Sequence, residues 1–301
     1  LVICGMGGSA IGGDLVRTLV EPESQIPILI NRSYLLPAWV DDRTLVVVSS
    51  YSGGTEETLS AFSEARSRNA TIVCITSGGV VLDLAKTERL PHIVIPGGLQ
   101  PRAALGYSFG PLLRFAAEIG LIDLNPSMVS AAAEHARRRA YHYSDSGGNR
   151  AIRLADELRD FIPVVYSGEG LLEAVNLRWR TQIHENAKSL AYGNLFPELD
   201  HNEIMSLEAA PTDLTKRIAV LSLRDADDHP QVERRMDITR DILMPALGKW
   251  IDIESEGESR LSRMLSLIQL GDWVSFWLAM HLQVDPSPVE SIQRLKKLLA
   301  S

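Results

Sequence analysis

The sequence predicts an α/β protein of two domains, each a mainly parallel, doubly wound sheet flanked by helices. Short apolar runs rich in β-branched residues alternate with amphipathic stretches along the chain. The apolar runs show no polar–apolar alternation, which is typical of strands covered on both faces. Repeated alternation of strand and helix produces a parallel sheet. A serine- and glycine-rich break at 144–149 interrupts this pattern, which then restarts and indicates a second domain.

The first part of the chain carries the elements of one complete sheet. Strands are predicted at 1–4, 26–30, 44–49, 71–76 and 92–95. Helices are predicted at 12–20, 55–68 and 82–87, followed by an apolar helix at 101–120 and a polar one at 125–143. We therefore expect a first domain at 1–122 and a helical connector at 123–150.

The same order of elements returns after the break. Strands are predicted at 162–167, 217–223 and 249–253. Helices are predicted at 151–160, 170–188, 231–244 and 259–283. Pro286 and Pro288 end the last of these helices, and an amphipathic helix at 289–299 closes the chain. We therefore expect a second domain at 151–285 and a separate C-terminal segment at 286–301.

Composition and charge exclude several classes of protein. With 38 acidic and 30 basic residues the net charge is −8, which argues against a nucleic-acid-binding protein. No apolar stretch reaches the length of about 18 residues that a membrane span needs. Cys4 and Cys74 lie in predicted strands, so we expect buried thiols in a reducing, cytoplasmic compartment. The chain opens on a strand without methionine, and we expect a further N-terminal segment before it.

A loop of hydroxyl side chains and glycines, residues 50–55, is the most informative segment. This serine loop follows a predicted strand, opens a predicted helix, and carries Ser50, Ser52 and Thr55 beside two glycines. Small residues let the backbone approach a ligand, and N–H groups at a helix start favour an anion. An ordinary helix cap would explain Thr55 alone. The whole loop, at the carboxyl end of a buried strand, predicts a phosphate site, and the absence of Gly-Lys-Ser/Thr argues against a nucleoside triphosphate.

A second glycine-rich turn, residues 5–13, follows the first predicted strand. Its spacing is a weak match to a dinucleotide fingerprint, because Asn31 and Arg32 stand where an acidic residue would be expected. We therefore expect Gly8 and Ser9 to line the same crevice as the serine loop and to contribute to phosphate binding.

Several short motifs occur in a fixed order along the chain. They are Gly-Met-Gly-Gly-Ser at 5–9, Ser-Tyr-Ser-Gly-Gly-Thr-Glu-Glu-Thr at 50–58, Pro-Arg-Ala-Ala-Leu at 101–105, Glu-Asn-Ala-Lys at 185–188, His-Asn-Glu at 201–203 and Leu-Lys at 295–296. Together they make the whole chain resemble the SIS (sugar isomerase) domain proteins, and more narrowly the bifunctional phosphoglucose/phosphomannose isomerase family. One departure is Gly54, which stands where the family usually has asparagine.

The resemblance implies an isomerase that interconverts glucose 6-phosphate, and mannose 6-phosphate, with fructose 6-phosphate through a cis-enediolate, without a cofactor. Such a reaction needs a base between C1 and C2, donors for the enediolate oxygens, and an acid or base that opens the ring. No cluster of His, Cys and carboxylate residues has metal-ligand spacing, so we expect side chains alone to fill these roles.

The resemblance assigns the base and the enediolate donor. Glu185 is the expected base. An isolated glutamate at a helix end would more often face solvent, but the match to the family at 185–188 favours the catalytic role. Arg102 is expected to stabilise the enediolate. A positive charge at a helix start is unfavourable against the helix dipole, which also favours a functional role for this arginine.

The resemblance also assigns residues that open the ring and contact the substrate hydroxyls. His201 lies in a polar turn and is matched to a ring-opening histidine that reaches into the partner subunit's site, so a homodimer is implied. Lys296 on the last helix is expected near the substrate hydroxyls, with Lys297 as the alternative. A small hydroxyl that leaves room for the enediol to rotate toward mannose 6-phosphate is expected at Thr58 or Ser287.

Two other functions remain open from the sequence. A SIS-domain sensor or regulator would bind a sugar phosphate without turnover, but it has no need of the four catalytic candidates. An amino-sugar isomerase or amidotransferase-linked domain is the second, although no glutaminase domain with an N-terminal cysteine is attached.

Overall fold

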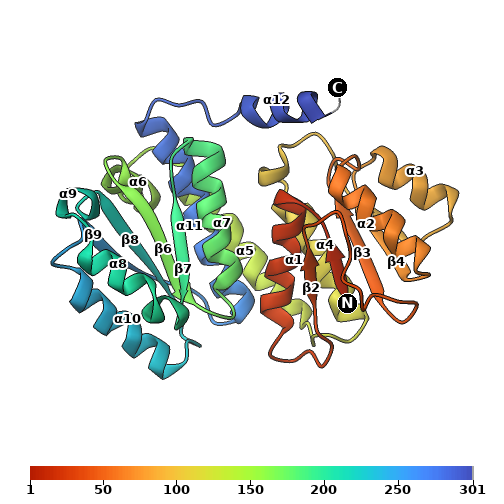
Figure 1. The fold of residues 1–301 in the computed structure, drawn as a ribbon, viewed down its shortest axis with the longest axis horizontal. Coiled ribbons are helices and arrows are strands. Elements are labelled where there is room, and N and C mark those ends of the chain that lie inside the picture. The colour runs from red at the N-terminus through yellow and green to blue at the C-terminus, as the bar shows by residue number, and fades with distance from the viewer. Residues whose placement is uncertain (300–301) are drawn as a thin grey trace. The chain divides into compact units, whose positions relative to one another are not determined.

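The structure is a computed structural model that describes residues 1–299. The chain divides into two compact units, Leu1–Asn125 and Pro126–Ser301. Each unit contains one parallel sheet with helices packed against it (Figure 1). The predicted fold class is therefore confirmed. None of the helices within residues 1–299 combines the length and the apolar character needed to cross a membrane.

The first unit is a doubly wound sheet of five strands in the order β2-β1-β3-β4-β5, and every pair is parallel. The strands are β1 (Val2–Cys4), β2 (Leu29–Asn31), β3 (Leu45–Ser50), β4 (Thr71–Thr76) and β5 (His92–Val94). The helices are α1 (Gly7–Val20), α2 (Glu56–Ser67), α3 (Gly79–Thr87) and α4 (Leu105–Glu118), with a 3₁₀ turn η1 (Pro101–Ala103). The strand order reverses between β1 and β3, which is where open α/β sheets bind ligands.

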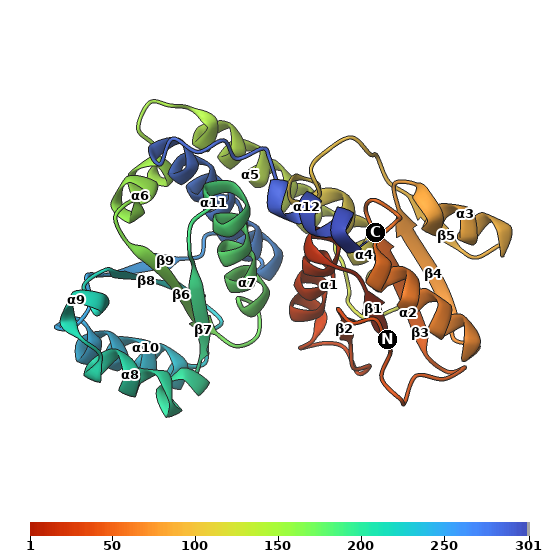
Figure 2. The same cartoon turned by 45° about the horizontal axis from the view of Figure 1, so that its top comes forward.

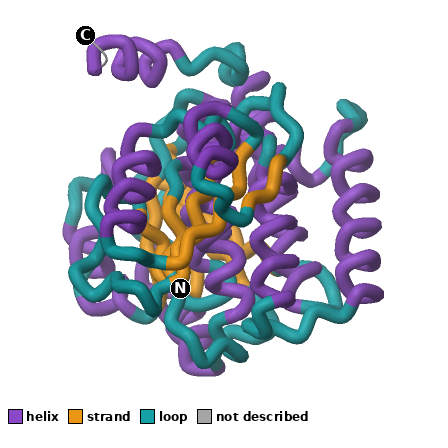
Figure 3. The backbone as a smooth tube through the Cα atoms, turned by 90° about the vertical axis from the view of Figure 1, so that its right-hand side faces the viewer, coloured by secondary structure: helices purple, strands orange, loops and turns teal. Residues whose placement is uncertain are grey.

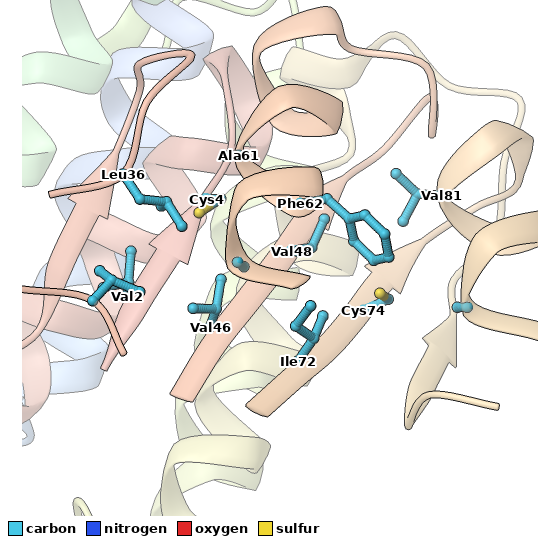
Figure 4. Packing of buried hydrophobic residues seen from close by; sticks show 13 residues of the cluster. Val2, Cys4, Leu36, Val46, Val48, Ala61, Phe62, Ile72, Cys74 and Val81 are labelled. Atoms are coloured by element: carbon cyan, nitrogen blue, oxygen red, sulfur yellow. The ribbon is translucent and has the colours of Figure 1, made fainter. Parts of the chain in front are cut away.

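The core of the first unit forms between its strands and α2. Phe62 of α2 lies over β3 and β4 beside Val48 and Cys74 (Figure 4). Cys4 and Cys74 are buried free thiols in β1 and β4, as predicted. Burial raises the pKa of Cys4 to about 12 and that of Cys74 to about 11, so both stay protonated near neutral pH and act as small core residues.

The second unit repeats this arrangement with four strands in the order β7-β6-β8-β9, again all parallel. The strands are β6 (Ile162–Gly168), β7 (Tyr192–Phe196), β8 (Ile218–Arg224) and β9 (Lys249–Glu254). The helices are α5 (Pro126–Ser144), α6 (Arg150–Leu158), α7 (Glu173–Gln182), α8 (Glu203–Ala209), α9 (Thr212–Thr215), α10 (Pro230–Leu243), α11 (Arg260–His281) and α12 (Glu290–Leu299). Two short turns, η2 (Ile183–Ala187) and η3 (Glu198–His201), complete the unit.

Helices cover both faces of the second sheet. One face carries α6, α7 and α11, and the other carries α8 and α10 (Figure 2). The first unit, which faces the viewer in Figure 3, likewise has its strands between helices. This layering places the carboxyl ends of the central strands, rather than their faces, within reach of a ligand.

The short helices α8 and α9 were not predicted, and three further differences from the predicted secondary structure concern the elements around the candidate residues. β7 was not predicted, because its sequence Tyr-Gly-Asn-Leu-Phe contains no apolar run. The helix predicted at 170–188 is an α-helix that ends at Gln182 and continues as the π-helical turn η2. The helix predicted at 101–120 begins as the 3₁₀ turn η1 before α4. Local periodicity cannot distinguish these tighter or wider turns from an α-helix.

Helix α7 packs closely against α11 at a point where one large side chain lies over a glycine. Trp179 is fully buried, and its indole Nε1 donates a hydrogen bond to the Leu267 carbonyl at 2.8 Å. Gly271 of α11 leaves the room for this ring, since a Cβ on Gly271 would lie 2.5 Å from the indole Nε1. The close approach of the two helices therefore depends on having no side chain at Gly271.

Replacing Gly271 by alanine should lower the free energy of unfolding by about 1–3 kcal/mol, because the new methyl overlaps a fixed indole. The control is Gly106→Ala at an exposed position of α4, where no described atom lies within 4 Å of the added Cβ apart from the chain neighbours and the backbone of the same helix. That change should instead stabilise by about 0.4–1 kcal/mol, as alanine restricts the unfolded chain. Urea unfolding followed by circular dichroism measures both; a Gly271→Ala protein as stable as the parent contradicts the packing described.

Candidate active site

The glycine-rich turn and the serine loop lie together at the carboxyl ends of β1 and β3. The backbone N–H of Tyr51 donates a hydrogen bond to Ser9 Oγ at 3.0 Å, and Ser9 is buried. Gly8 lies one residue before it, in the first turn of α1. The structure therefore brings Gly8 and Ser9 next to the serine loop, as the sequence predicted.

The hydroxyl groups of the serine loop converge on one another. Ser50 Oγ donates to Thr55 Oγ1 at 3.3 Å and accepts from the backbone N–H of Gly53 at 3.1 Å. Ser52 Oγ lies 3.5 Å from the same Thr55 Oγ1 and is exposed. Thr55 is the N-cap of α2, yet within residues 1–299 its side chain makes no capping hydrogen bond. Its hydroxyl faces the other two, so an ordinary cap does not explain the loop.

The two glycines of the loop have different roles. Gly53 has a φ of +67°, and a Cβ there would lie 1.7 Å from the Gly78 carbonyl oxygen. Only glycine fits this position without moving the backbone. Gly54 is different, because none of the described atoms lies within 4 Å of a Cβ built on it. The asparagine usual in the resembling family would meet no obstacle at its Cβ.

The segment that carries Arg102 packs against both of these loops. It lies in η1 and is 7% exposed. A Cβ on Gly8 would lie 2.6 Å from the Pro101 carbonyl oxygen, so the glycine-rich turn packs directly against η1. From the other side, the Tyr51 hydroxyl accepts a hydrogen bond from the Leu99 N–H at 3.0 Å. The phosphate candidates and Arg102 are thus neighbours in the first unit.

Glu185 lies in the π-helical turn η2 at the end of α7 and is half-buried. Single π turns occur often at functional sites, because they displace side chains from the regular helical register. Lys188, in the left-handed conformation with φ of 52°, ends the turn. Its Nζ donates to the backbone carbonyls of Glu185 and, at 3.2 Å, of Pro286. His184 takes no part in these lysine contacts; its Nε2 lies 2.8 Å from the Ala191 carbonyl oxygen.

Helix α11 holds the segment that carries Glu185 through polar contacts. Asp272 accepts hydrogen bonds from Arg178 Nη2 at 2.7 Å and from Gln182 Nε2 at 3.0 Å. Asn186 Nδ2 donates to Ser275 Oγ at 2.9 Å. Sequence reasoning missed Asp272 and Ser275, because they lie about ninety residues further along the chain and belong to no recognised motif.

The remaining candidates lie in less buried positions. His201 is the last residue of η3 and is exposed, as is Lys296 in α12. Ser287 is exposed, and its N–H donates to Asp285 Oδ1 at 2.8 Å. Thr58 is buried in α2, and its Oγ1 has no hydrogen-bond partner among the described residues. The first unit thus carries the phosphate candidates, Arg102 and Thr58, while the second carries the other candidates.

The part of the chain that the structure describes contains no group of three or more His, Cys, Asp or Glu side chains arranged to hold a metal ion. The polar groups that gather at the strand ends of the first unit are instead hydroxyls, backbone N–H groups and one arginine. Groups of this kind bind oxyanions.

Two parallel, doubly wound sheets, with a hydroxyl-rich loop at the switch point of the first, define the class of SIS-domain sugar-phosphate proteins. A family model for the bacterial phospho-glucose isomerase C-terminal SIS domain matches residues 148–299. The solved glucosamine-6-phosphate deaminase of Thermotoga maritima has the same fold, with a TM-score of 0.72 and 15% sequence identity over 95% of this chain and 86% of that one.

Two relatives narrow the class to a family. A bifunctional phosphoglucose/phosphomannose isomerase of Caldicellulosiruptor bescii is 45% identical over 303 residues, covering 100% of this chain and 89% of that protein. One of Aquifex aeolicus is 37% identical over 300 residues, covering 99% and 90%. The chain belongs to the bifunctional phosphoglucose/phosphomannose isomerase family, and it is an isomerase.

The geometry of the serine loop predicts that alanine substitutions at its two neighbouring glycines affect ligand affinity very differently. Gly53→Ala should weaken binding of glucose 6-phosphate at least about tenfold, because the loop must move away from Gly78. The matched change Gly54→Ala meets open space and should alter the affinity by no more than about twofold. Isothermal titration calorimetry measures both. Equal effects of the two substitutions would show that the geometry of this loop does not govern binding.

Proposed function

We propose that this protein interconverts glucose 6-phosphate, and also mannose 6-phosphate, with fructose 6-phosphate by proton transfer through a cis-enediolate. The observation that carries the proposal is the half-buried Glu185, placed in a π turn that α11 braces. The names of the relatives in Caldicellulosiruptor bescii and Aquifex aeolicus support both substrates.

The phosphate group is held at the ends of β1 and β3. Hydroxyls of Ser50, Ser52 and Thr55 turn from one another toward the phosphate oxygens, and Ser9 and the backbone of Gly8 complete the site. These groups sit at the N-termini of α1 and α2, whose dipoles favour an anion. The phosphate fixes one end of the substrate, so the reacting carbons can be held in one place.

Proton transfer then takes place between C2 and C1 of the open-chain sugar. Glu185 removes the C2 proton of the aldose, and the electrons of that bond form the C1–C2 double bond of the enediolate. A proton passes from the C2 oxygen to the C1 oxygen, and the same carboxyl group returns a proton to C1 as the C2–O bond becomes the carbonyl of the ketose. Arg102 stabilises the negative charge on the enediolate oxygen, which is largest in the transition state. Lys296 contacts the substrate hydroxyls.

Ring opening precedes this transfer and is the role of His201. A neutral imidazole accepts the proton of the anomeric hydroxyl, and the imidazolium so formed gives a proton to the ring oxygen as the bond between that oxygen and C1 breaks. His201 is exposed on its own chain, which suits the proposal that it completes the site of a second copy in a homodimer. For mannose 6-phosphate the enediolate rotates about C2–C3, and a small hydroxyl at Thr58 or Ser287 leaves room for this.

Glu185→Gln should reduce turnover by about a hundredfold to ten-thousandfold, because the amide cannot accept a proton, while glucose 6-phosphate still binds. The control is Glu208→Gln, the same change at an exposed position of α8. Formation of fructose 6-phosphate from each aldose phosphate is followed in a coupled assay, and binding by calorimetry.

Near-normal turnover by Glu185→Gln would remove this residue as the base. A parent protein that binds glucose 6-phosphate but converts neither aldose would instead identify a non-catalytic sensor.

A further inference from the structure

The turn that carries His201 is flanked by two carboxylates, Asp200 and Glu203, which bind different parts of the second unit. The imidazole between them is exposed. An exposed histidine on a short 3₁₀ turn would ordinarily be mobile, because such turns have poor hydrogen-bond geometry. The contacts on either side therefore determine how well its backbone is fixed.

Glu203 connects the turn to two neighbouring strands of the sheet. Its Oε1 accepts a hydrogen bond from the Tyr166 hydroxyl of β6, and its Oε2 accepts one from Asn194 Nδ2 of β7, both at 2.7 Å. Tyr166 is fully buried. Burial, followed by the nearby Glu203 carboxylate, raises the pKa of the Tyr166 hydroxyl, so it remains a donor near neutral pH.

Asp200 connects the other side of the turn to α10. Its Oδ1 accepts a hydrogen bond from Thr239 Oγ1 at 2.8 Å, and its Oδ2 accepts one from Arg235 Nη1 at 2.9 Å. The side chain of Asp200 is only 10% exposed, so solvent competes little for these bonds. Between the two anchors, Asn202 Oδ1 accepts the Glu203 N–H at 2.6 Å and caps α8.

Both oxygens of each carboxylate are thus occupied by donors within the same unit. A carboxylate engaged in this way is poorly placed to exchange protons with a substrate, but it fixes the backbone on its side of residue 201. We propose that Asp200 and Glu203 are positioning residues that hold His201 in the orientation needed for ring opening. The inference rests on the ring-opening role proposed above for His201.

Ring opening can be measured separately from proton transfer. Interconversion of the α and β anomers of glucose 6-phosphate requires the ring to open and close but leaves the C2 proton in place. Exchange spectroscopy by NMR measures how much the enzyme increases the rate of anomer interconversion above the spontaneous rate. An acyclic five-carbon aldonate 5-phosphate, which needs no ring opening and has a carboxylate where the enediolate forms, reports on the rest of the site through its inhibition constant.

Glu203→Ala should lower the catalysed anomer interconversion at least about tenfold, because a displacement of about 1 Å is enough to remove much of a catalytic effect. The inhibition constant of the aldonate phosphate should stay within about twofold. Glu203→Gln keeps the shape and part of the hydrogen bonding and should recover most of the rate. Asp200→Ala should behave like Glu203→Ala, and Glu208→Ala on the same helix should change neither quantity.

Unchanged anomer interconversion in a folded Glu203→Ala protein overturns the inference. So does a parallel loss of inhibitor binding, which would indicate a purely structural role. If Glu203→Ala does not fold, as judged by circular dichroism, Tyr166→Phe takes its place: it removes one donor and must slow interconversion without changing inhibitor binding.

His201→Asn separates this inference from the proposed function. Interconversion that survives His201→Asn removes the ring-opening role itself. Interconversion lost in His201→Asn but retained in Glu203→Ala contradicts only the positioning role. If the inference holds, adding Glu203→Ala to His201→Asn causes no further loss.

Discussion

The packing of the Trp179 indole over Gly271 is the contact on which the position of Glu185 in the second unit depends. It brings α7 against α11 closely enough for Asp272 to bind Arg178 and Gln182, and for Ser275 to bind Asn186. Each of these polar contacts lies within one or two turns of the π turn that presents Glu185. Loss of the indole would leave a cavity between the two helices and weaken the support of the turn that carries Glu185.

The two sheets share a topology but differ in chemistry at equivalent positions. In β2-β1-β3-β4 the loop after β3 is the serine loop, whereas in β7-β6-β8-β9 the loop after β8 carries Asp225, Asp227 and Asp228. There Arg263 binds Asp225, both of them buried, and also Asp227. Burial raises the pKa of Asp228 to about 6. An acidic loop that holds its own arginine and lacks the hydroxyls of the serine loop is less suited to binding an anion than the equivalent loop of the first sheet.

The sequence predicted those features whose physical cause is local. Buried parallel strands are continuous apolar runs, and an anion loop needs small residues and hydroxyls in one stretch, so both sheets and the serine loop could be foreseen. β7 could not, since Gly193 and Asn194 interrupt its apolar character. The π turn has no sequence signature. Of the two partners of Glu203, Tyr166 lies 37 residues away along the chain, and Asn194 lies on β7, the strand that the sequence did not predict. The roles of the predicted site residues remain proposals.

The central claim is that a carboxylate moves a proton between C2 and C1. The most direct measurement is conversion of glucose 6-phosphate in D₂O, with NMR of the fructose 6-phosphate formed. Proton transfer by Glu185 predicts deuterium at C1 of the product, because a carboxyl proton exchanges with solvent while the enediolate persists. If no deuterium entered C1 even after the two sugar phosphates had interconverted many times, the result would indicate direct hydride transfer and would contradict the claim.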